Sequence, residues 1–513
     1  MNRRDFIKIA SVTLGAGVLS ATIGVKSFQD YFGGYTPATG SAQSTSSATV
    51  NKPVTPGTPQ YFFLIYVDGL HPVYIEKFKP PNIMSLISEG TYFPNAFVGH
   101  LTSNTIVSHA VGNAGLYPAR WGIVDYGWRN IYDDPALNQI VPKNKAIDPG
   151  NYNLIVNYDL PSKIRRQYEH SLPSFPLWLK SNFPDALTVG ISTKQYMATY
   201  LANMDIRVMG KTTQDNYIVP YYQLGPAEGL VNDVMIRSDE VLTKADNWVG
   251  EVAGRILENL RPRYMLLNLP DVDLNAHRNG GPATLDQMYQ YVMNADRVVG
   301  EFVDRLKNMG IYDKSVIVIT ADHGFSANYD YVNTDEIKNG LESKGLKVDL
   351  IRGASGYMTI WLSDPYFKDN SSKKAAADYV KQALPEANAV FYKASFNVGT
   401  DTVYHYVPVK DDGRPQYPQL LKTMTTPAGP DVIAFFGDEM SAYNKYVANH
   451  GGAGWLVQNI PIIIRGPGVP RGMVVETVPY SGPKLADIAP TFISLVDSSD
   501  SAINRFDGKP IFS

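Results

Sequence analysis

A short run of β-branched residues, from Ser315 to Thr320, constrains the fold of this chain more than any other sequence feature. The run is too short for a helix and is followed by turn-forming residues, so it predicts a buried strand. Asp322 and His323, which can both bind a metal ion, come directly after it. Ligands bind at the carboxyl ends of strands in open parallel sheets, so this position is compatible with a metal-binding site. By itself, however, a strand followed by Asp-His-Gly is more often an ordinary turn.

Further apolar runs predict strands that alternate with helices along the chain. Apolar residues spaced three and four apart, with Pro or Gly at the ends, indicate the helices. No repeat of fixed period is present, and the alternation predicts an α/β fold with a doubly wound, mainly parallel central sheet flanked by helices. The expected strands include 61–67, 187–191, 264–269 and 461–465, and the expected helices include 80–90, 238–260, 283–309 and 484–496.

The length and composition allow one large domain with an insertion. The chain has 513 residues, of which 44% are hydrophobic and 19% charged, as in folded soluble proteins. Helix and strand signals are mixed over residues 331–430, which predicts a smaller inserted α+β subdomain. A catalytic core is then expected over residues 61–330 and 431–513.

The amino terminus resembles an export signal. Arg3 and Arg4 precede Phe-Ile-Lys and a mostly apolar stretch over residues 9–25, so residues 1–35 are predicted to be a twin-arginine signal. The alternative is the basic start of an amphipathic helix, but no polar stripe interrupts the stretch. The predicted partner is the twin-arginine export machinery. The predicted location is extracytoplasmic, whether secreted, periplasmic or anchored at the cell surface.

Two features beside the signal bear on membrane attachment. Ser20-Ala21-Thr22 is a weak cleavage site, so retention of residues 9–25 as a membrane anchor stays an alternative to removal of the signal. Residues 36–60 are rich in Ser, Thr, Pro and Ala, which is typical of a disordered linker between a signal and a folded enzyme.

Charge and cysteine content exclude several classes of function. The formal net charge is -3 and the pI is near 6.3, so there is no basic field for sequence-specific nucleic-acid binding. The chain has no cysteine, which excludes disulfides and thiolate metal sites. Any metal ion must therefore be bound by carboxylates and by some of the 8 histidines.

Carboxylates and histidines follow several predicted strands or lie in a glycine-rich loop. Each is ordinary by itself, because Asp68 before Gly69 is typical of a loop and Asp273 with His277 is more often a surface pair. The combination is much less expected by chance, since oxygen and nitrogen ligands in this number suit two hydrolytic metal ions. The candidate ligands are Asp68, Asp273, His277, Asp322, His323 and His450.

Thr105 lies in a hydroxyl-rich segment before a predicted helix of small residues. In one interpretation its side chain caps the helix by accepting from free backbone N–H groups. In the other, the hydroxyl attacks a phosphate held by those N–H groups, because a helix amino terminus carries partial positive charge. The two interpretations are compatible, and nearby metal ligands would favour the second.

A set of motifs occurs in a definite order along the chain. They are Val67-Asp68-Gly69, Thr105 through His109, Gly122-Ile123-Val124, Asp273 through His277, Thr320-Ala321-Asp322-His323-Gly324 and Asn449-His450-Gly451. In order and context they resemble the alkaline phosphatase superfamily, in particular its type I phosphodiesterase and nucleotide pyrophosphatase branch.

The resemblance implies a metal-dependent phosphoric ester hydrolase with two divalent metal ions, expected to be zinc. The implied nucleophile is Thr105, which would form a phospho-threonine-type covalent intermediate. The implied substrate is a small-molecule phosphate ester or a nucleotide, and a phosphodiesterase or nucleotide pyrophosphatase is favoured. One zinc ion would be bound by Asp68, Thr105, Asp322 and His323, and the other by Asp273, His277 and His450.

Substrate preference depends on positions where the chain departs from the branch. The branch usually has an asparagine after the Gly-Ile-Val run, which donates to a phosphoryl oxygen, and here Asp125 and Tyr126 follow instead. Tyr126 or Asn130 is a candidate for that donor. Lys194 falls where some monoesterases of the superfamily place a phosphate-binding lysine, although a solvated surface lysine is at least as common. A phosphomonoesterase is therefore an alternative.

Other functions would share most of these residues. A phosphotransferase that moves a head group to a glycan or lipid would differ only in its acceptor. A metal-binding protein without activity would lack the nucleophile, and Thr105 is present. A sulfatase would need Cys or Ser as the precursor of formylglycine, so Thr105 argues against it.

Overall fold

The computed structural model describes residues 24–27, 31, 57–122, 124–147, 172–199, 201, 203–443 and 446–512. The twin-arginine motif, the weak cleavage site and nearly all of the linker 36–60 lie outside these residues. The structure therefore does not bear on the twin-arginine motif or on the cleavage site. Among the described residues, no helix combines the length and the apolar character that a membrane crossing requires.

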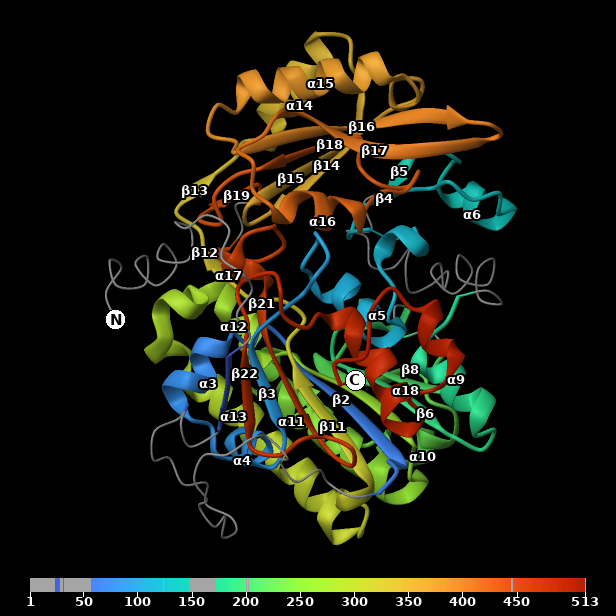
Figure 1. Ribbon diagram of the computed structural model, residues 1–513, viewed down its shortest axis with the longest axis vertical. Helices are drawn as coiled ribbons and strands as arrows, with labels where there is room; N and C mark the ends of the chain where they lie inside the picture. Colours follow the sequence, from blue (N-terminus) through green and yellow to red (C-terminus); the bar gives the residue numbers. More distant parts are fainter. Residues whose placement is uncertain are drawn as a thin grey trace.

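A large sheet forms the centre of the molecule, and the strands in its middle are parallel (Figure 1). These strands are apolar and almost entirely buried, as expected where helices cover both faces. Their order is β11 (Ser315–Thr320), β2 (Tyr61–Val67), β10 (Tyr264–Leu269), β6 (Thr188–Ser192) and β7 (Ile206–Thr212). The predicted α/β fold with a mainly parallel central sheet is confirmed.

The pairing is mainly antiparallel toward both edges of this sheet. On one side β21 (Asn459–Arg465) and β3 (Thr91–Phe97) follow β11, and on the other β8 (Tyr217–Gln223) and β9 (Ile236–Arg237) follow β7. Beyond β3 lie β22 (Met473–Glu476) and then β1 (Gly24–Ser27), which pairs antiparallel with β22. Residues of the predicted signal segment 1–35 thus contribute an edge strand.

Helices cover both faces of the sheet, and two neighbouring residues of β2 show why. Side chains alternate between faces along a strand, so Phe62 and Phe63 point in opposite directions. Phe62 packs on aromatic rings of α9 (Phe175–Asn182) and α18 (Ile488–Val496), whereas Phe63 packs on α13 (Leu285–Asn308). The remaining long covering helices are α4 (Pro81–Glu89), α5 (Thr105–Ala114) and α11 (Val241–Leu260).

A second sheet with its own hydrophobic core forms a smaller subdomain at the top of Figure 1. Its strand order is β14 (Val348–Ala354), β15 (Tyr357–Leu362), β18 (Val432–Phe435), β16 (Ala389–Val398) and β17 (Asp401–Lys410), and helices α14 (Thr334–Ser343) and α15 (Asn370–Ala383) accompany it. Residues 431–513 were predicted to belong to the catalytic core. This is wrong for β18, which lies in the small sheet. A short apolar run predicts a buried strand but does not say which sheet receives it.

Short elements complete the chain around the two sheets. They are α3 (Pro72–Phe78), α6 (Pro135–Ile140), α10 (Glu228–Val231), α12 (Asp271–Asn279), α16 (Gln416–Lys422), α17 (Trp455–Gln458), β4 (Trp128–Arg129), β5 (Ala146–Ile147), β12 (Ser326–Ala327), β13 (Asp330–Tyr331), β19 (Met440–Ser441) and β20 (Ala448–Asn449). Pairing of β12 with β20 brings the segment after β11 beside the loop that carries His450.

Candidate active site

The carboxyl ends of β2, β10 and β11 meet at one edge of the sheet, because Tyr66 is in register with Thr320 and Val67 with Leu269. Asp68 therefore follows β2 beside Asp322, which follows β11, and the Gly69 N–H donates to Asp322 Oδ1 over 3.1 Å. Gly69 has a φ of 73°, and a Cβ there would lie 2.7 Å from the Phe325 ring. Only glycine suits this turn, which explains the Asp-Gly pair.

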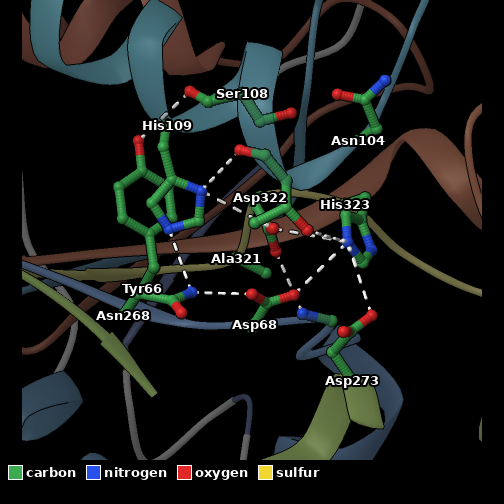
Figure 2. A network of polar contacts seen from close by, with 12 residues as sticks. Tyr66, Asp68, Asn104, Ser108, His109, Asn268, Asp273, Ala321, Asp322 and His323 are labelled. Carbon is green, nitrogen blue, oxygen red and sulfur yellow. Dashed lines mark hydrogen bonds and ion pairs between the residues drawn. The ribbon is translucent and has the colours of Figure 1, made fainter. Parts of the chain in front are cut away.

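The structure brings all the predicted metal ligands together in a largely buried cluster. His323 Nε2 lies 3.4 Å from Asp68 Oδ1, 3.3 Å from Asp322 Oδ2 and 3.7 Å from Asp273 Oδ1. On α12, Asp273 and His277 are one turn apart, and Asp273 Oδ1 lies 3.3 Å from His277 Nε2. The same oxygen is 3.7 Å from His450 Nε2. Figure 2 shows several of these side chains pointing toward one another.

The histidines in the cluster are oriented by backbone carbonyls. Nδ1 of His277 lies 2.9 Å from the Ala448 oxygen, Nδ1 of His323 3.1 Å from the Gly324 oxygen, and Nδ1 of His450 2.9 Å from the Ser103 oxygen. A carbonyl only accepts, so Nδ1 is the donor in each ring. Nε2 then presents its lone pair to the cluster, which is the usual arrangement of a metal-binding histidine.

Three carboxylate oxygens in the cluster are buried without a hydrogen-bond donor among the described residues. They are Asp68 Oδ1, Asp273 Oδ1 and Asp322 Oδ2. Buried polar atoms normally have partners, and unpartnered ones are costly. Bound cations would satisfy these oxygens, and the donor set of carboxylates and neutral imidazoles fits zinc.

The ammonium group of Lys194 lies between the carboxylates of Asp68 and Asp273. Its Nζ is 2.8 Å from Asp68 Oδ2, 2.7 Å from Asp273 Oδ2 and 3.4 Å from Thr105 Oγ1, and its side chain is 8% exposed. Burial acts to lower the pKa of Lys194, but the charges of Asp273 and Asp68 outweigh it and raise the pKa well above its usual value. The alternative of a solvated surface lysine is thus wrong.

The buried carboxylates carry more negative charge than Lys194 compensates. Burial and the charge of Asp68 raise the pKa of Asp322. Burial acts to raise the pKa of Asp68 as well, but the Lys194 ammonium outweighs it and the pKa is lowered. Three carboxylates beside one ammonium group make this part of the protein suited to further positive charge.

Thr105 is the first residue of α5, but it is not the residue that caps this helix. The N-cap is Asn104, whose Oδ1 accepts from the Val107 N–H over 3.1 Å. The Thr105 hydroxyl instead lies in the cluster, 3.5 Å from His323 Nε2 and almost fully buried. The capping interpretation of Thr105 is therefore wrong, and its role as the nucleophile stays a prediction.

Asn268 and His109 lie behind the predicted ligands, and neither was among the predicted site residues. Asn268 Nδ2, on β10, donates to Asp68 Oδ2 over 2.6 Å and to His109 Nε2 over 3.1 Å (Figure 2). His109 Nδ1 lies 2.8 Å from the Thr105 carbonyl oxygen, so both ring nitrogens are engaged. Burial lowers the pKa of His109 to about 3, consistent with a neutral ring. A polar residue in an otherwise apolar strand was the available signal for Asn268.

Distances alone do not divide the cluster into two metal sites. Ligand atoms of Asp273, His323 and His450 lie within 4.8 Å of one another, and so do those of Asp68, His109 and Asp322. The second group is not a ligand set, because neither nitrogen of His109 is available. The partition predicted from the sequence keeps His109 out, and it stays a prediction.

Residues 62–451 match the family described as Type I phosphodiesterase / nucleotide pyrophosphatase. The chain belongs to this family. The match extends from β2 to the loop after His450, so it includes every predicted metal ligand and Thr105.

Curated relatives are distant. The chain is 24% identical to an uncharacterized sulfatase, YdeN, of Escherichia coli (strain K12), over 48% of this chain and 42% of that protein. It is 21% identical to the human bis(5'-adenosyl)-triphosphatase ENPP4, over 69% of this chain and 66% of the relative. It is 24% identical to venom phosphodiesterase 2 of Crotalus adamanteus, over 51% of this chain and 26% of the relative. The chain thus spans less than two thirds of the length of each of these relatives.

Solved structures show the same fold. The alkaline phosphatase PafA aligns with a TM-score of 0.61 at 15% identity, over 89% of this chain and 98% of PafA. Murine ectonucleotide pyrophosphatase / phosphodiesterase 5, in an inactive form in complex with AMP, aligns with a TM-score of 0.55 at 13% identity, over 85% of this chain and 95% of that protein. The fold is therefore that of the alkaline phosphatase superfamily, as predicted.

Asp125, where this chain departs from the branch, and Asn130, a candidate for the missing amide donor, both have partners within the protein. Asp125 accepts from Asn104 Nδ2 over 2.9 Å and from the Tyr357 hydroxyl over 3.1 Å, so it ties the loop to β15 of the small subdomain. The Asn130 amide donates to Asn138 Oδ1 and to the Val141 carbonyl, and its oxygen accepts from the Tyr132 N–H. Asn130 stabilises its own loop, which argues against the substrate-binding role predicted for it.

Tyr126 is partly exposed, unlike Asp125. Its ring lies edge-on to Tyr196, with centroids 5.9 Å apart, and the Arg352 guanidinium lies 5.9 Å from its ring centroid. Tyr196 is two residues after Lys194, so Tyr126 lies on the side of the site where Lys194 enters. Its predicted part in substrate binding stays a prediction.

Proposed function

We propose that the protein is an exported hydrolase of phosphate esters, a phosphodiesterase or nucleotide pyrophosphatase that uses two zinc ions and Thr105 as its nucleophile. The observation that supports this most is the Thr105 hydroxyl, buried at the start of α5 and 3.5 Å from His323 Nε2 among six metal-competent side chains. Family membership supports phosphoester hydrolysis, and the twin-arginine motif supports export.

The proposed metal ligands divide as the family resemblance implies. Asp68, Asp322 and His323, with the Thr105 oxygen, would hold one zinc ion, and Asp273, His277 and His450 would hold the other. The three unpartnered carboxylate oxygens, one from each aspartate, support cation binding in this cluster. When bound, the ions would lower the pKa of the hydroxyl and neutralise phosphoryl and leaving oxygens.

In the proposed reaction Thr105 Oγ attacks phosphorus, in line with the leaving oxygen. A phosphorus–oxygen bond to Thr105 forms, the bond to the leaving group breaks, and the leaving group departs as an alcohol or a phosphate with the proton of the hydroxyl. Water then attacks the phospho-threonine, which releases the phosphate product and restores the hydroxyl. Lys194 Nζ, 3.4 Å from Thr105 Oγ1, would hold a phosphoryl oxygen.

A phosphomonoesterase is the second candidate, and Lys194 favours it. A dianionic monoester carries one more negative charge than a diester, and a buried ammonium beside the nucleophile stabilises that charge. Asp125 does not offer the amide donor that is usual in the branch, and its carboxylate is engaged by Asn104 and Tyr357. Family membership favours the diester, so the two candidates need a direct comparison.

The test is a comparison of kcat/KM for p-nitrophenyl phosphate, bis-p-nitrophenyl phosphate and thymidine 5'-p-nitrophenyl phosphate, with the zinc-loaded full-length enzyme. We expect the two diesters to be hydrolysed faster than the monoester. A large preference for the monoester would replace the phosphodiesterase proposal by the second candidate. Lack of hydrolysis of all three would contradict both.

A further inference from the structure

The carboxyl-terminal part of the predicted signal segment 1–35 belongs to the folded domain. β1 pairs antiparallel with β22 along its whole length, from Gly24 opposite Glu476 to Ser27 opposite Met473. Lys26 Nζ forms an ion pair with Glu476 Oε2 at 2.6 Å. The strand thereby covers the edge of β22, which would otherwise present unpaired backbone groups.

Tyr31 attaches the same segment to two other elements. Its hydroxyl donates to Glu76 Oε1 on α3 over 2.8 Å. Its ring meets the buried ring of Tyr92, on β3, edge-on, with centroids 6.2 Å apart. Burial and the neighbouring Glu76 raise the pKa of Tyr31. The segment is therefore held both by backbone pairing and by a half-buried side chain.

We infer that the chain from Gly24 onward is retained in the mature protein, with β1 as a permanent strand of the large sheet and Tyr31 as a second point of attachment. Proteolytic processing of the predicted signal then occurs before Gly24 or does not occur. Cleavage after Tyr31 would remove four ladder positions, the Lys26–Glu476 ion pair and the Tyr31 contacts. The limit on the cleavage position follows from the pairing of β1 with β22 and does not depend on the proposed catalytic function.

This placement changes the role of the Ser, Thr and Pro-rich residues 36–60. Both Tyr31 and the strand that begins at Tyr61 belong to the same domain. If β1 is retained, residues 36–60 join two parts of one fold in the chain order, instead of joining a signal to the enzyme as predicted.

Intact-mass and amino-terminal peptide analysis of the protein exported by a host with a twin-arginine pathway tests the retention. We expect a mature chain that begins at or before Gly24 and yields a peptide containing Lys26 and Tyr31. A mature chain that begins after Gly24 would overturn the inference.

An engineered disulfide tests the pairing itself in full-length protein, whether exported or purified from the cytoplasm. The chain has no cysteine, so only the introduced thiols can react. Ser27→Cys with Met473→Cys joins residues that are opposite each other, and oxidation should give one intramolecular disulfide.

The matched control is Lys26→Cys with Met473→Cys, in which the two positions are one residue out of register. Their side chains point to opposite faces of the sheet, so they should stay reduced under the same conditions. Equal disulfide yields in the two variants, or no disulfide in either, would overturn the inference.

Discussion

At the residue scale, the position of Thr105 depends on its neighbour. Asn104 Oδ1 accepts from the Val107 N–H and so caps α5, which leaves the Thr105 hydroxyl directed at the cluster of predicted metal ligands. His109, one turn later, accepts from Asn268, and its Nδ1 lies 2.8 Å from the Thr105 carbonyl oxygen. The backbone at Thr105 is thus fixed by groups that do not touch its hydroxyl, as a preorganised nucleophile requires.

Thr105→Ala should lower kcat on the preferred ester by about 10³-fold or more, because the attacking oxygen is removed. Thr105→Ser keeps a hydroxyl at the same place and should retain most of the activity. Steady-state kinetics with zinc-loaded proteins of equal circular dichroism measure this. Full turnover by the alanine variant would remove the nucleophile assignment.

Lys194→Met should act mainly on the monoester. The lost contact is a charge-assisted hydrogen bond of about 2–3 kcal/mol, so kcat/KM for p-nitrophenyl phosphate should fall about 30- to 150-fold, and that for the bis-ester should fall less. The matched control is Lys180→Met, which removes an ion pair with Asp205 on the surface away from Thr105. An equal fall in kcat/KM for both substrates would show that Lys194 does not distinguish a dianionic monoester from a monoanionic diester.

At the scale of elements, the site is made by strand ends and helix starts. Asp68 and Asp322 follow parallel neighbours in register, while α12 presents Asp273 and His277 one turn apart. The N-cap of α5 also reaches the small subdomain, because Asn104 Nδ2 donates to Asp125, which accepts from Tyr357 on β15. The Asp125 carboxylate therefore links α5, which carries Thr105, to the inserted subdomain.

Asn104→Ala should destabilise the protein by about 1–2 kcal/mol through loss of the cap, and it should also lower kcat. Chemical denaturation and kinetics measure the two effects. The control is Asn333→Ala, which removes the same kind of cap from α14. It should cost similar stability and leave kcat unchanged. If both variants keep full activity, the coupling described for Asn104 is wrong.

At the scale of the whole molecule, a buried ion pair joins the core loop of β4 to the small sheet. Arg129 donates to Asp431 Oδ2 over 2.7 Å and to the Leu362 carbonyl over 2.8 Å, and both charged side chains are fully buried. The Arg129 guanidinium also covers the Phe367 ring at 3.9 Å. These contacts attach the small subdomain to the core. The same subdomain carries Tyr357, whose hydroxyl donates to Asp125 beside the candidate site.

Arg129→Met should destabilise the protein by about 3–5 kcal/mol, because it leaves the Asp431 carboxylate buried without its main partner. Urea unfolding followed by tryptophan fluorescence measures the change. Arg237→Met breaks the exposed Arg237–Asp239 pair instead and should have no measurable effect. A small change for Arg129→Met would mean that Lys393, 3.7 Å from Asp431, compensates.

Removal of metal should affect both activity and stability of the whole protein. A chelator should abolish hydrolysis and lower the Tm, since ions that bind only the folded state stabilise it by mass action. Added zinc should restore both, and metal analysis of active enzyme should give about two ions per chain. Activity in protein shown to be free of metal would contradict the two-zinc proposal.

Local sequence was sufficient for the core strands and for the metal-competent residues that follow them. Runs such as 61–67 and 316–319 are continuously apolar because helices cover both faces of the sheet, and this pattern can be recognised in the sequence alone. The positions of Asp68, Asp273 and Asp322 relative to strand ends, together with the order of the motifs, were enough to predict the family and the fold.

Features that depend on partners distant in the sequence could be assigned only from the tertiary structure. Lys194 is 126 residues from Asp68 and 79 from Asp273, so its burial between them has no local signal. Asn104 rather than Thr105 caps α5, Asn130 is used within its own loop, and β18 joins the small sheet, because several local choices were equally compatible with the sequence. Pairing of β1 with β22 is of the same kind, since an edge strand is defined by the neighbour it finds.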